Sequence, residues 1–522
     1  MAEVSLSTSR VIFSSPLAAL ARWCASEDPT LTQPSLDELK RSQPERREPR
    51  LQRLALVNVC LGQFMSALDS RSVNVALPTL SVYFDASLAV VQWIPLAYQL
   101  TIVGLVLSMA RLGDKLGRKR IYALGFVLLG VGSACCGLSA ELWQIIMFRV
   151  VEAIGGALVL ANGRAIASAL YAQEGRGRAL GMMSMSFHLG YITGPSVGGF
   201  LVDTIGWRWI FFMNLPVAVA AAAMAWKILP ETVTEKRDYS IDPIGMITLL
   251  LTVVSLIVGL QQIAKSGFGP LPIAAGVVSL ISLGLLLHFE RRDPVPLLDL
   301  SLFKVRLLTA AILSHFFVSL SHTSTFFLLP FYLQGILRFT PTQVGVTIIF
   351  FSLVIVFLAP IGGWLADRLG SRMLCTVGSL LTALSMVGFS RLGADSGQIG
   401  VMVPLMLLGL GWSLFQSPNL SGMFNAVAPR YVGAVSGLSL TSANIANAMG
   451  VAVGSALFLR WLNYHGLRDS VVPPYTQWGD APEIFIKSFQ DSWLIIAGFA
   501  SIAIVTSAMR GVDKRGKGGE LE

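Results

Sequence analysis

Long apolar runs of roughly 18–25 residues recur along this chain, and short segments between them hold most of its charges. A helix of that length crosses the ~30 Å hydrocarbon core of a membrane. Only 13% of the residues are charged, whereas a soluble globular protein carries about 25%. The sequence therefore predicts an all-α integral membrane protein. Length and apolar content place about fourteen spans near residues 54–80, 90–110, 121–139, 142–165, 178–202, 209–229, 242–263, 271–289, 308–335, 343–365, 373–392, 397–420, 432–461 and 492–509.

Basic residues alternate between the connections of these spans. The segment before the first span and the connection after every second span hold them in groups, as in Lys115 to Arg120, whereas the other connections hold few. By the positive-inside rule both termini are then cytoplasmic, which requires an even number of spans. We expect the longest connection on the sparse side to run from Asn463 to Asp491. The net charge of +9 follows from these loops, so we expect no nucleic-acid partner.

Gly190, Gly194 and Gly198 recur at every fourth residue within the run GMMSMSFHLGYITGPSVGG, which covers residues 181–199. On a helix they form one face without side chains, which lets a neighbouring membrane helix approach closely. Pro195 removes a helical hydrogen bond and crowds the carbonyl of Tyr191, so we expect a bend at the Gly194–Pro195 step. Such a helix could seal against a partner and then open, or form an ordinary packing face of a membrane bundle.

Two short loops with an acidic and then a basic residue resemble each other. The run DKLGRK begins at Asp114 and joins the second and third predicted spans, and the run DRLGSR begins at Asp367 and joins the tenth and eleventh. Equivalent places for the two loops imply two six-helix halves related by duplication. Two further spans, near 242–263 and 271–289, then lie between the halves. The simpler alternative is a pair of solvated charge runs that fix topology.

Together these features resemble the major facilitator superfamily. The glycine run is similar to the antiporter motif of its fifth helix, and the repeated loops are similar to those that link its helices. Further runs resemble its fourteen-span drug:proton antiporter branch: LDSRSVNVALP from Leu68, WRWIFFMNLP from Trp207, DPIG from Asp242, YLQ from Tyr332 and QSPN from Gln416. Their order along one chain makes the resemblance specific.

The resemblance implies a major facilitator fold, which consists here of two six-helix bundles plus two inserted central helices. We expect an N-terminal bundle over residues 54–229, the central helices and cytoplasmic linkers over 230–307, and a C-terminal bundle over 308–510. Residues 1–53 end in a stretch dense in Glu, Arg, Gln and Pro, which predicts a disordered cytoplasmic tail. Residues 511–522 are expected to form a basic cytoplasmic tail.

The resemblance also implies a set of gating residues. In the family, the Asp of the first loop and the Arg that follows it form an ion pair and helix-end interactions that hold the outward-facing state. Asp114 and Arg118 inherit this role by position. The implied gating residues are Asp114, Gly117, Arg118, Gly190, Gly194, Pro195, Gly198, Asp367 and Arg368.

Three ionisable residues within the predicted spans are the candidates for proton coupling: Asp69, Arg149 and Glu152. A charge inside a membrane costs several kcal/mol unless it is paired or hydrated. Asp69 lies near the middle of the first span, and in the family this residue is a candidate proton carrier. Arg149 begins the run RVVEAIGG in the fourth span, which resembles the family motif RxxQGxG, whose Arg is tied to proton transfer.

Two of the departures from the family pattern introduce a charge, because Arg71 replaces the usual Thr and Glu152 replaces the usual Gln. Counted at ~1.5 Å per residue, they lie at similar depth. We therefore hypothesise a buried ion pair between them. In the alternative, Arg71 faces water and Glu152 pairs only with Arg149. The predicted substrate-cavity residues are Arg71, Asn74, Gln334 and Asn419.

His315 and His322 share one face of the ninth predicted span, because they are seven residues apart. They are candidates either for a proton relay or for two polar residues that face the cavity.

The HExxH motif is missing from the sequence, and its one GxSxG match, residues 194–198, lies within the predicted span 178–202 instead of at a strand-to-helix turn. The five cysteines have no metal-ligand spacing, so we expect no metal and no cofactor. The glycine- and lysine-rich run from Gly511 lacks the Ser or Thr that ends a phosphate-binding loop. Without a nucleotide site, transport must use an ion gradient.

We therefore predict a proton-coupled antiporter that exports amphipathic organic compounds or drugs across the plasma membrane by alternating access. Its expected partners are the small-molecule substrate, protons, membrane lipid and, in a host with an outer membrane, an adaptor protein. One alternative is a proton-coupled transporter of a specific metabolite, peptide or siderophore, and Arg71 would then favour an anionic solute. Another alternative is a membrane sensor that transports nothing.

Overall fold

The apolar runs of the sequence become long helices in the structure, a computed structural model. It describes residues 49–170, 173–229, 243–291, 300–427, 432–466 and 482–510, which form helices joined by turns and hold no strand. Residues 55–522 form one unit and residues 1–54 a separate one. The predicted basic tail 511–522 and most of the predicted tail 1–53 lie outside the described residues.

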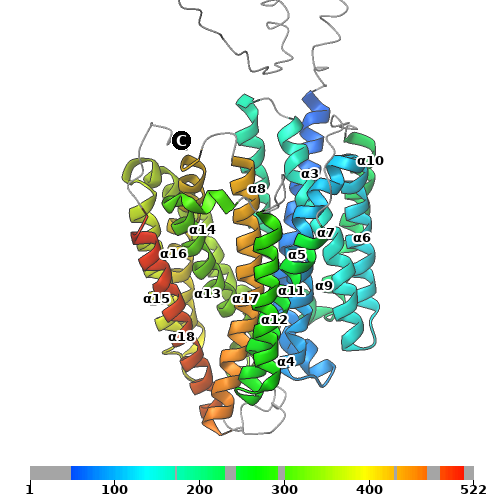
Figure 1. Cartoon of the computed structure of the whole chain (residues 1–522). Coiled ribbons are helices and arrows are strands. Elements are labelled where there is room, and N and C mark those ends of the chain that lie inside the picture. Colours follow the sequence, from blue (N-terminus) through cyan, green and yellow to red (C-terminus); the bar gives the residue numbers. More distant parts are fainter. Residues whose placement is uncertain are drawn as a thin grey trace, which may run out of the picture. The chain divides into compact units, whose positions relative to one another are not determined.

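Each predicted span coincides with one helix, except that 90–110 and 209–229 each include a one-turn helix followed by a long one. Within residues 55–522 the long helices run side by side (Figure 1). Thirteen helices among the described residues are long and apolar enough to cross a membrane. Helix α8, in which Gly, Ser and His dilute the apolar residues, is not one of these thirteen. The helices are α3 (Pro49–Tyr83), α4 (Leu88–Val91), α5 (Trp93–Leu116), α6 (Arg118–Leu138), α7 (Leu142–Leu170), α8 (Gln173–Thr204), α9 (Trp209–Phe212), α10 (Asn214–Ile228), α11 (Pro243–Ser266), α12 (Pro270–Glu290), η1 (Leu300–Lys304), α13 (Arg306–Gly335), α14 (Pro341–Leu369), α15 (Ser371–Phe389), α16 (Gly397–Asn425), α17 (Val432–His465) and α18 (Pro482–Ala508).

The predicted loop from Asn463 to Asp491 is wrong in its second part, because α18 already begins at Pro482. Phe485 and Phe489 lie one helical turn apart and are buried, whereas charged residues occupy the positions between and after them. This amphipathic turn packs into the bundle. Its charges hid it from a prediction based on continuous apolar length.

Helices within each predicted half pack against one another. In the N-terminal half (α3–α10), α6 packs against α7 and α10, and α5 packs against α7. In the C-terminal half (α13–α18), α16 packs against α14 and α15, and α13 packs against α17 and α18. The inserted helix α11 contacts α5 and α17, one from each half, and α12 packs on α11 (Figure 1). The inserted pair therefore lies along the seam between the halves.

The duplicated loops are tight turns built on glycine. Gly117 separates α5 from α6 with φ of 98°, and Gly370 separates α14 from α15 with φ of 83°. Residues with a side chain rarely adopt such angles, so both turns favour glycine. Because consecutive spans alternate in direction, the two turns lie at one end of the bundle together with most loop arginines and lysines. We call this end the basic end, and the other the opposite end.

Apolar packing joins the halves more closely towards the opposite end. One core cluster contains residues of both halves, including Leu77 and Leu80 of α3 and Phe327 of α13. Near the basic end, one cluster is formed by N-terminal residues around Tyr122 and Phe126. Another is formed by C-terminal residues, with Leu308, Ile312 and Met423 among its members.

Candidate functional site

The glycine face of α8 lies against α3. A Cβ added to Gly194 would lie 2.8 Å from the Cβ of Arg71 and 2.9 Å from the carbonyl oxygen of Leu68. A Cβ on Gly198 would lie 2.7 Å from the Cα of Ser72, and one on Gly190 would meet a backbone carbonyl of α3. The two backbones are thus in direct contact, as the four-residue spacing predicted.

A second contact of α8 reaches the C-terminal half. Helix α8 continues through Pro195 to Thr204, and a Cβ on Gly345 of α14 would lie 2.6 Å from the carbonyl oxygen of Pro195. The Ser196 hydroxyl donates to the Gly345 carbonyl at 3.2 Å. Nearby, the Thr342 hydroxyl donates to Asp203 at 2.7 Å. Helix α8 therefore links α3 to the other half.

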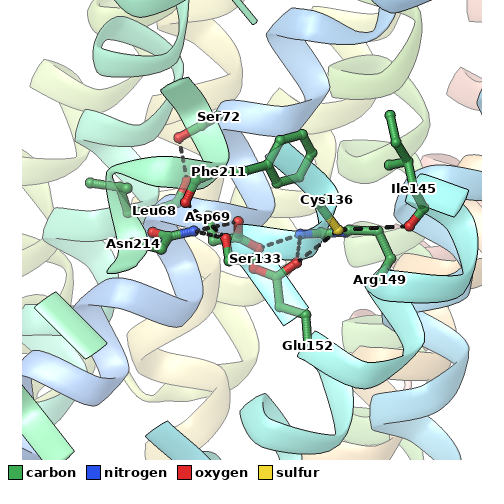
Figure 2. Close-up of polar contacts among 10 residues, drawn as sticks. All are labelled: Leu68, Asp69, Ser72, Ser133, Cys136, Ile145, Arg149, Glu152, Phe211 and Asn214. Atoms are coloured by element: carbon green, nitrogen blue, oxygen red, sulfur yellow. Dashed lines mark hydrogen bonds and ion pairs between the residues drawn. The ribbon is translucent and has the colours of Figure 1, made fainter. Parts of the chain in front are cut away.

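Asp69, Arg149 and Glu152 meet in one buried cluster, which we call the charge cluster (Figure 2). Nη1 of Arg149 donates to Oδ2 of Asp69 at 2.7 Å and to Oε2 of Glu152 at 2.9 Å. Their exposed fractions are 1% for Asp69, 1% for Arg149 and 0% for Glu152. The three predicted proton-coupling residues are thus direct partners, with no access to water in this conformation.

Neighbouring helices supply further contacts of the charge cluster. Asn214, the first residue of α10, donates to Oδ1 of Asp69 at 2.9 Å and to the Ser133 hydroxyl at 3.0 Å (Figure 2). The guanidinium of Arg149 lies 4.3 Å from the ring centre of Tyr98. Both oxygens of Asp69 therefore accept hydrogen bonds, whereas Oε1 of Glu152 has no partner. Asn214 was not among the predicted site residues, because an amide at the start of a helix commonly caps that helix.

The hypothesised ion pair between Arg71 and Glu152 is not present. Glu152 pairs with Arg149, as the alternative had it, and Arg71 is 7% exposed and lies over the ring of Tyr191 instead of facing water. Arg71 and Glu152 were predicted at similar depth, but depth does not fix the direction of a side chain. Asp69 and Arg71 are two positions apart on α3, so they point in directions that differ by roughly 200° around the helix axis. Since Asp69 faces α7, Arg71 must face another side of α3.

Arg71 belongs to a second group of residues, which bridges the two halves and which we call the bridging cluster. Its guanidinium carbon lies 3.7 Å from the ring centre of Tyr191 on α8. The Tyr191 hydroxyl forms a hydrogen bond of 3.0 Å with Nδ1 of His322 on α13. The His322 ring stacks on Trp412 of α16, with centres 4.5 Å apart and planes 21° apart. Phe326 packs against both Arg71 and His322.

The charge of Arg71 is poorly compensated within this cluster. No ion pair among the described residues includes it, and its Nη1 is buried without a hydrogen-bond partner. A desolvated cation–π contact contributes about 2 kcal/mol, whereas burying an ion costs several kcal/mol even after relaxation. Tyr191 alone therefore does not offset the burial of Arg71.

The other predicted substrate-cavity residues lie apart from one another. Asn74 is buried on α3, and its Oδ1 has no partner. Gln334 of α13 donates to the Val75 carbonyl of α3 at 3.1 Å, so it joins the halves towards the opposite end. Asn419 of α16 accepts a hydrogen bond from Arg510, which follows α18. Asn419 therefore belongs to a buried contact inside the C-terminal half.

His315 and His322, candidates either for a proton relay or for two polar residues that face the cavity, do not form a continuous chain. His315 stacks on Phe415, with ring centres 6.3 Å apart, whereas His322 contacts Tyr191 and Trp412. The two histidines share a helix face but contact different residues, because different helices pack against α13 at the two depths. The importance of Tyr191 and Trp412 could not be read from the sequence, since aromatic residues are common in membrane helices.

Each of the two predicted gate loops contains an arginine with a defined contact. Nε of Arg118 donates to Oδ1 of Asp114 at 2.6 Å, and both side chains are about one-fifth exposed. In the second loop, the guanidinium of Arg368 lies 3.9 Å from the ring centre of Trp364. The Asp367 side chain lies outside the described residues. The first loop thus contains the ion pair that its motif implied.

A family model described as Major Facilitator Superfamily matches residues 59–451. The riboflavin transporter RibZ of Clostridioides difficile is 30% identical over 88% of this chain and 98% of its own length. The tetracenomycin C resistance and export protein of Streptomyces glaucescens is 30% identical over 76% of this chain and 74% of its own. The multidrug resistance protein Stp of Mycobacterium tuberculosis is 29% identical over 79% and 77%.

A solved structure shares the fold. A bacterial homologue of the human lysosomal transporter Spinster, in an inward-facing and unoccupied conformation, aligns with a TM-score of 0.66 at 15% identity. The alignment covers 89% of this chain and 97% of that chain.

Proposed function

We propose that this chain, which belongs to the Major Facilitator Superfamily and is a multi-pass membrane transporter of small molecules, exports an amphipathic organic compound in exchange for protons. We place it in the plasma membrane with both termini in the cytoplasm, on the basis of its charge distribution. The observation that carries the proposal is the charge cluster, in which two buried carboxylates share one arginine.

The charge of this cluster changes with a single proton. With both acids ionised, Asp69, Arg149 and Glu152 sum to −1, and one bound proton makes the sum zero. A net charge in a buried site is costly, so gain or loss of that proton changes the relative free energies of conformations that bury or expose the site. This is the property that proton coupling requires.

Glu152 is the acid that can accept the proton with least rearrangement. Its Oε1 has no hydrogen-bond partner, so a proton there leaves both contacts of Arg149 in place. A proton on Asp69 would instead compete with the amide of Asn214 or the guanidinium of Arg149. We therefore assign the proton to Glu152 in this conformation, and to Asp69 the role of holding Arg149 in position.

Helix α3 can carry the coupling from protons to substrate. Asp69 faces the charge cluster, Arg71 faces the bridging cluster, and the α8 glycine face packs between them on the same helix. Apolar contacts between the halves towards the opposite end support a conformation that is closed there. We propose that alternating access opens this end and closes the basic end.

Vesicles that contain the purified protein test the coupling. An imposed pH gradient should drive substrate flux with proton counterflow in the wild type. Glu152→Gln should lose gradient-driven flux but keep substrate binding, because glutamine has nearly the same shape and cannot ionise. Asp69→Asn should also lose coupling, and in addition lose stability through the weaker hold on Arg149. Undiminished gradient-driven flux in both variants would rule out the charge cluster as the proton site.

A second candidate is transport of one specific metabolite instead of many compounds. It is favoured by RibZ, which aligns over 98% of its length and is named for a single solute. A flux screen separates the two candidates, since a multidrug exporter moves several unrelated compounds with similar efficiency.

A further inference from the structure

We propose that the bridging cluster binds a planar aromatic anion, with the acidic group on Arg71 and the aromatic ring against Tyr191, His322 and Trp412. This inference rests on the proposed transport function and adds the chemical class of the substrate. It concerns organic carboxylates and sulfonates that carry fused or linked aromatic rings.

The first argument is charge. Arg71 is 7% exposed, has a buried Nη1 without a hydrogen-bond partner, and lies in no ion pair among the described residues. The carboxylates of Asp69 and Glu152 already share Arg149. A carboxylate or sulfonate on the substrate would supply the missing anion through charge-assisted hydrogen bonds. A cationic substrate would instead add a second positive charge.

The second argument is the set of ring planes beside this charge. The rings of Tyr191 and His322 lie within 22° of parallel, with centres 5.9 Å apart, and the His322 and Trp412 planes differ by 21°. Phe326 and Phe351 pack around the imidazole. Nearly parallel faces favour flat aromatic rings. His322 is 1% exposed and its Nε2 has no partner, so the imidazole also keeps one polar atom for a ligand.

The third argument is position. Arg71 and Tyr191 belong to the N-terminal half, and His322 and Trp412 belong to the C-terminal half. A hydrogen bond between the Tyr191 hydroxyl and Nδ1 of His322 joins the two sets. Relative movement of the halves therefore changes the distance between Arg71 and the His322–Trp412 pair. The affinity for a ligand held by both sets would therefore differ between conformations, as it must for a transported substrate.

Equilibrium binding to the purified full-length protein in detergent tests this proposal. Fluorescein serves as the anionic probe, and tetramethylrhodamine methyl ester serves as the cationic probe with the same xanthene core. The variants are Arg71→Gln, which removes the charge, and Arg71→Lys, which keeps it. Arg208→Gln is the matched control, because Arg208 also lies over aromatic rings, those of Tyr83 and Trp207, but outside the bridging cluster.

We expect the wild type to bind fluorescein at least tenfold more tightly than the cationic probe. Arg71→Gln should weaken fluorescein binding by roughly ten- to a hundredfold, the range for a lost charge-assisted hydrogen bond. It should not weaken binding of the cationic probe. Arg71→Lys should keep the preference for the anion, and Arg208→Gln should match the wild type.

Three results would overturn the proposal: no binding of fluorescein, a wild-type preference for the cation, or an equal loss of both probes in Arg71→Gln. The last would show that Arg71 only maintains the fold of the site. Because the binding assay uses no gradient, its outcome is independent of proton coupling. Gradient-driven flux of other compounds without fluorescein binding would refute this inference and leave the proposed function intact.

Discussion

Replacement of Arg149 with methionine removes the one cation of the charge cluster and leaves a shorter, unbranched apolar side chain. Asp69 and Glu152 would then lose the hydrogen bonds of 2.7 Å and 2.9 Å that Arg149 donates. All three side chains are at most 2% exposed, so water cannot replace the lost partner. Removal of one member of a buried ion pair costs about 3–5 kcal/mol. We expect Arg149→Met to lie near the upper end of that range, because two acids lose their partner.

A triple variant separates stranded charge from lost packing. Asp69→Asn, Arg149→Met and Glu152→Gln together leave no charge in the cluster. A neutral replacement of a buried charge network is often close to neutral in stability. The free energy of unfolding of the triple variant should therefore lie within about 1–2 kcal/mol of the wild-type value, a difference that corresponds to one or two weaker hydrogen bonds.

Unfolding in detergent with increasing SDS, followed by tryptophan fluorescence, gives the free energy of unfolding of each variant. Arg208→Met is the control. The guanidinium carbon of this half-buried arginine lies 4.4 Å from the ring centre of Trp207, a contact that should contribute about 1 kcal/mol or less to the free energy of unfolding. If the single Arg149 variant were as stable as the triple variant, the two acids would not depend on Arg149. The charge cluster would then be an accidental contact and not a coupled unit.

Two glycines allow predictions with matched controls. Gly194→Ala should destabilise the protein by about 1–3 kcal/mol and impair flux, because its Cβ would lie 2.8 Å from the Cβ of Arg71. The control Gly276→Ala should have no effect, because a Cβ there would have no atom within 4 Å. Equal effects of the two substitutions would refute the close-contact role of the α8 face. Gly117→Ala should cost about 1–3 kcal/mol of stability through its φ of 98° alone, whereas Gly269→Ala, also in open space but with φ of −154°, should cost far less. Thermal unfolding in detergent compares the two variants, and a Gly117 variant as stable as the Gly269 variant would show that the turn tolerates side chains.

The sequence alone was enough for the features that depend on local composition and spacing. Apolar length located the spans, because the membrane imposes the same minimum length on each helix. The four-residue glycine spacing located the α8 face, and the repeated loops located the glycine turns at Gly117 and Gly370. Prediction failed at the start of α18, where charged residues in an amphipathic turn interrupted the apolar run.

Within the membrane spans, only the tertiary structure decided which polar residues are partners. A count along the chain gives depth, so it placed Arg71 and Glu152 at one level, but it does not give the rotation of each helix about its axis. That rotation turns Asp69 towards Arg149 and Arg71 towards Tyr191, and it is set by packing among helices far apart in sequence. The same reason explains why Asn419 contacts Arg510 and Gln334 contacts Val75, since each partnership depends on which neighbouring helix a side chain faces.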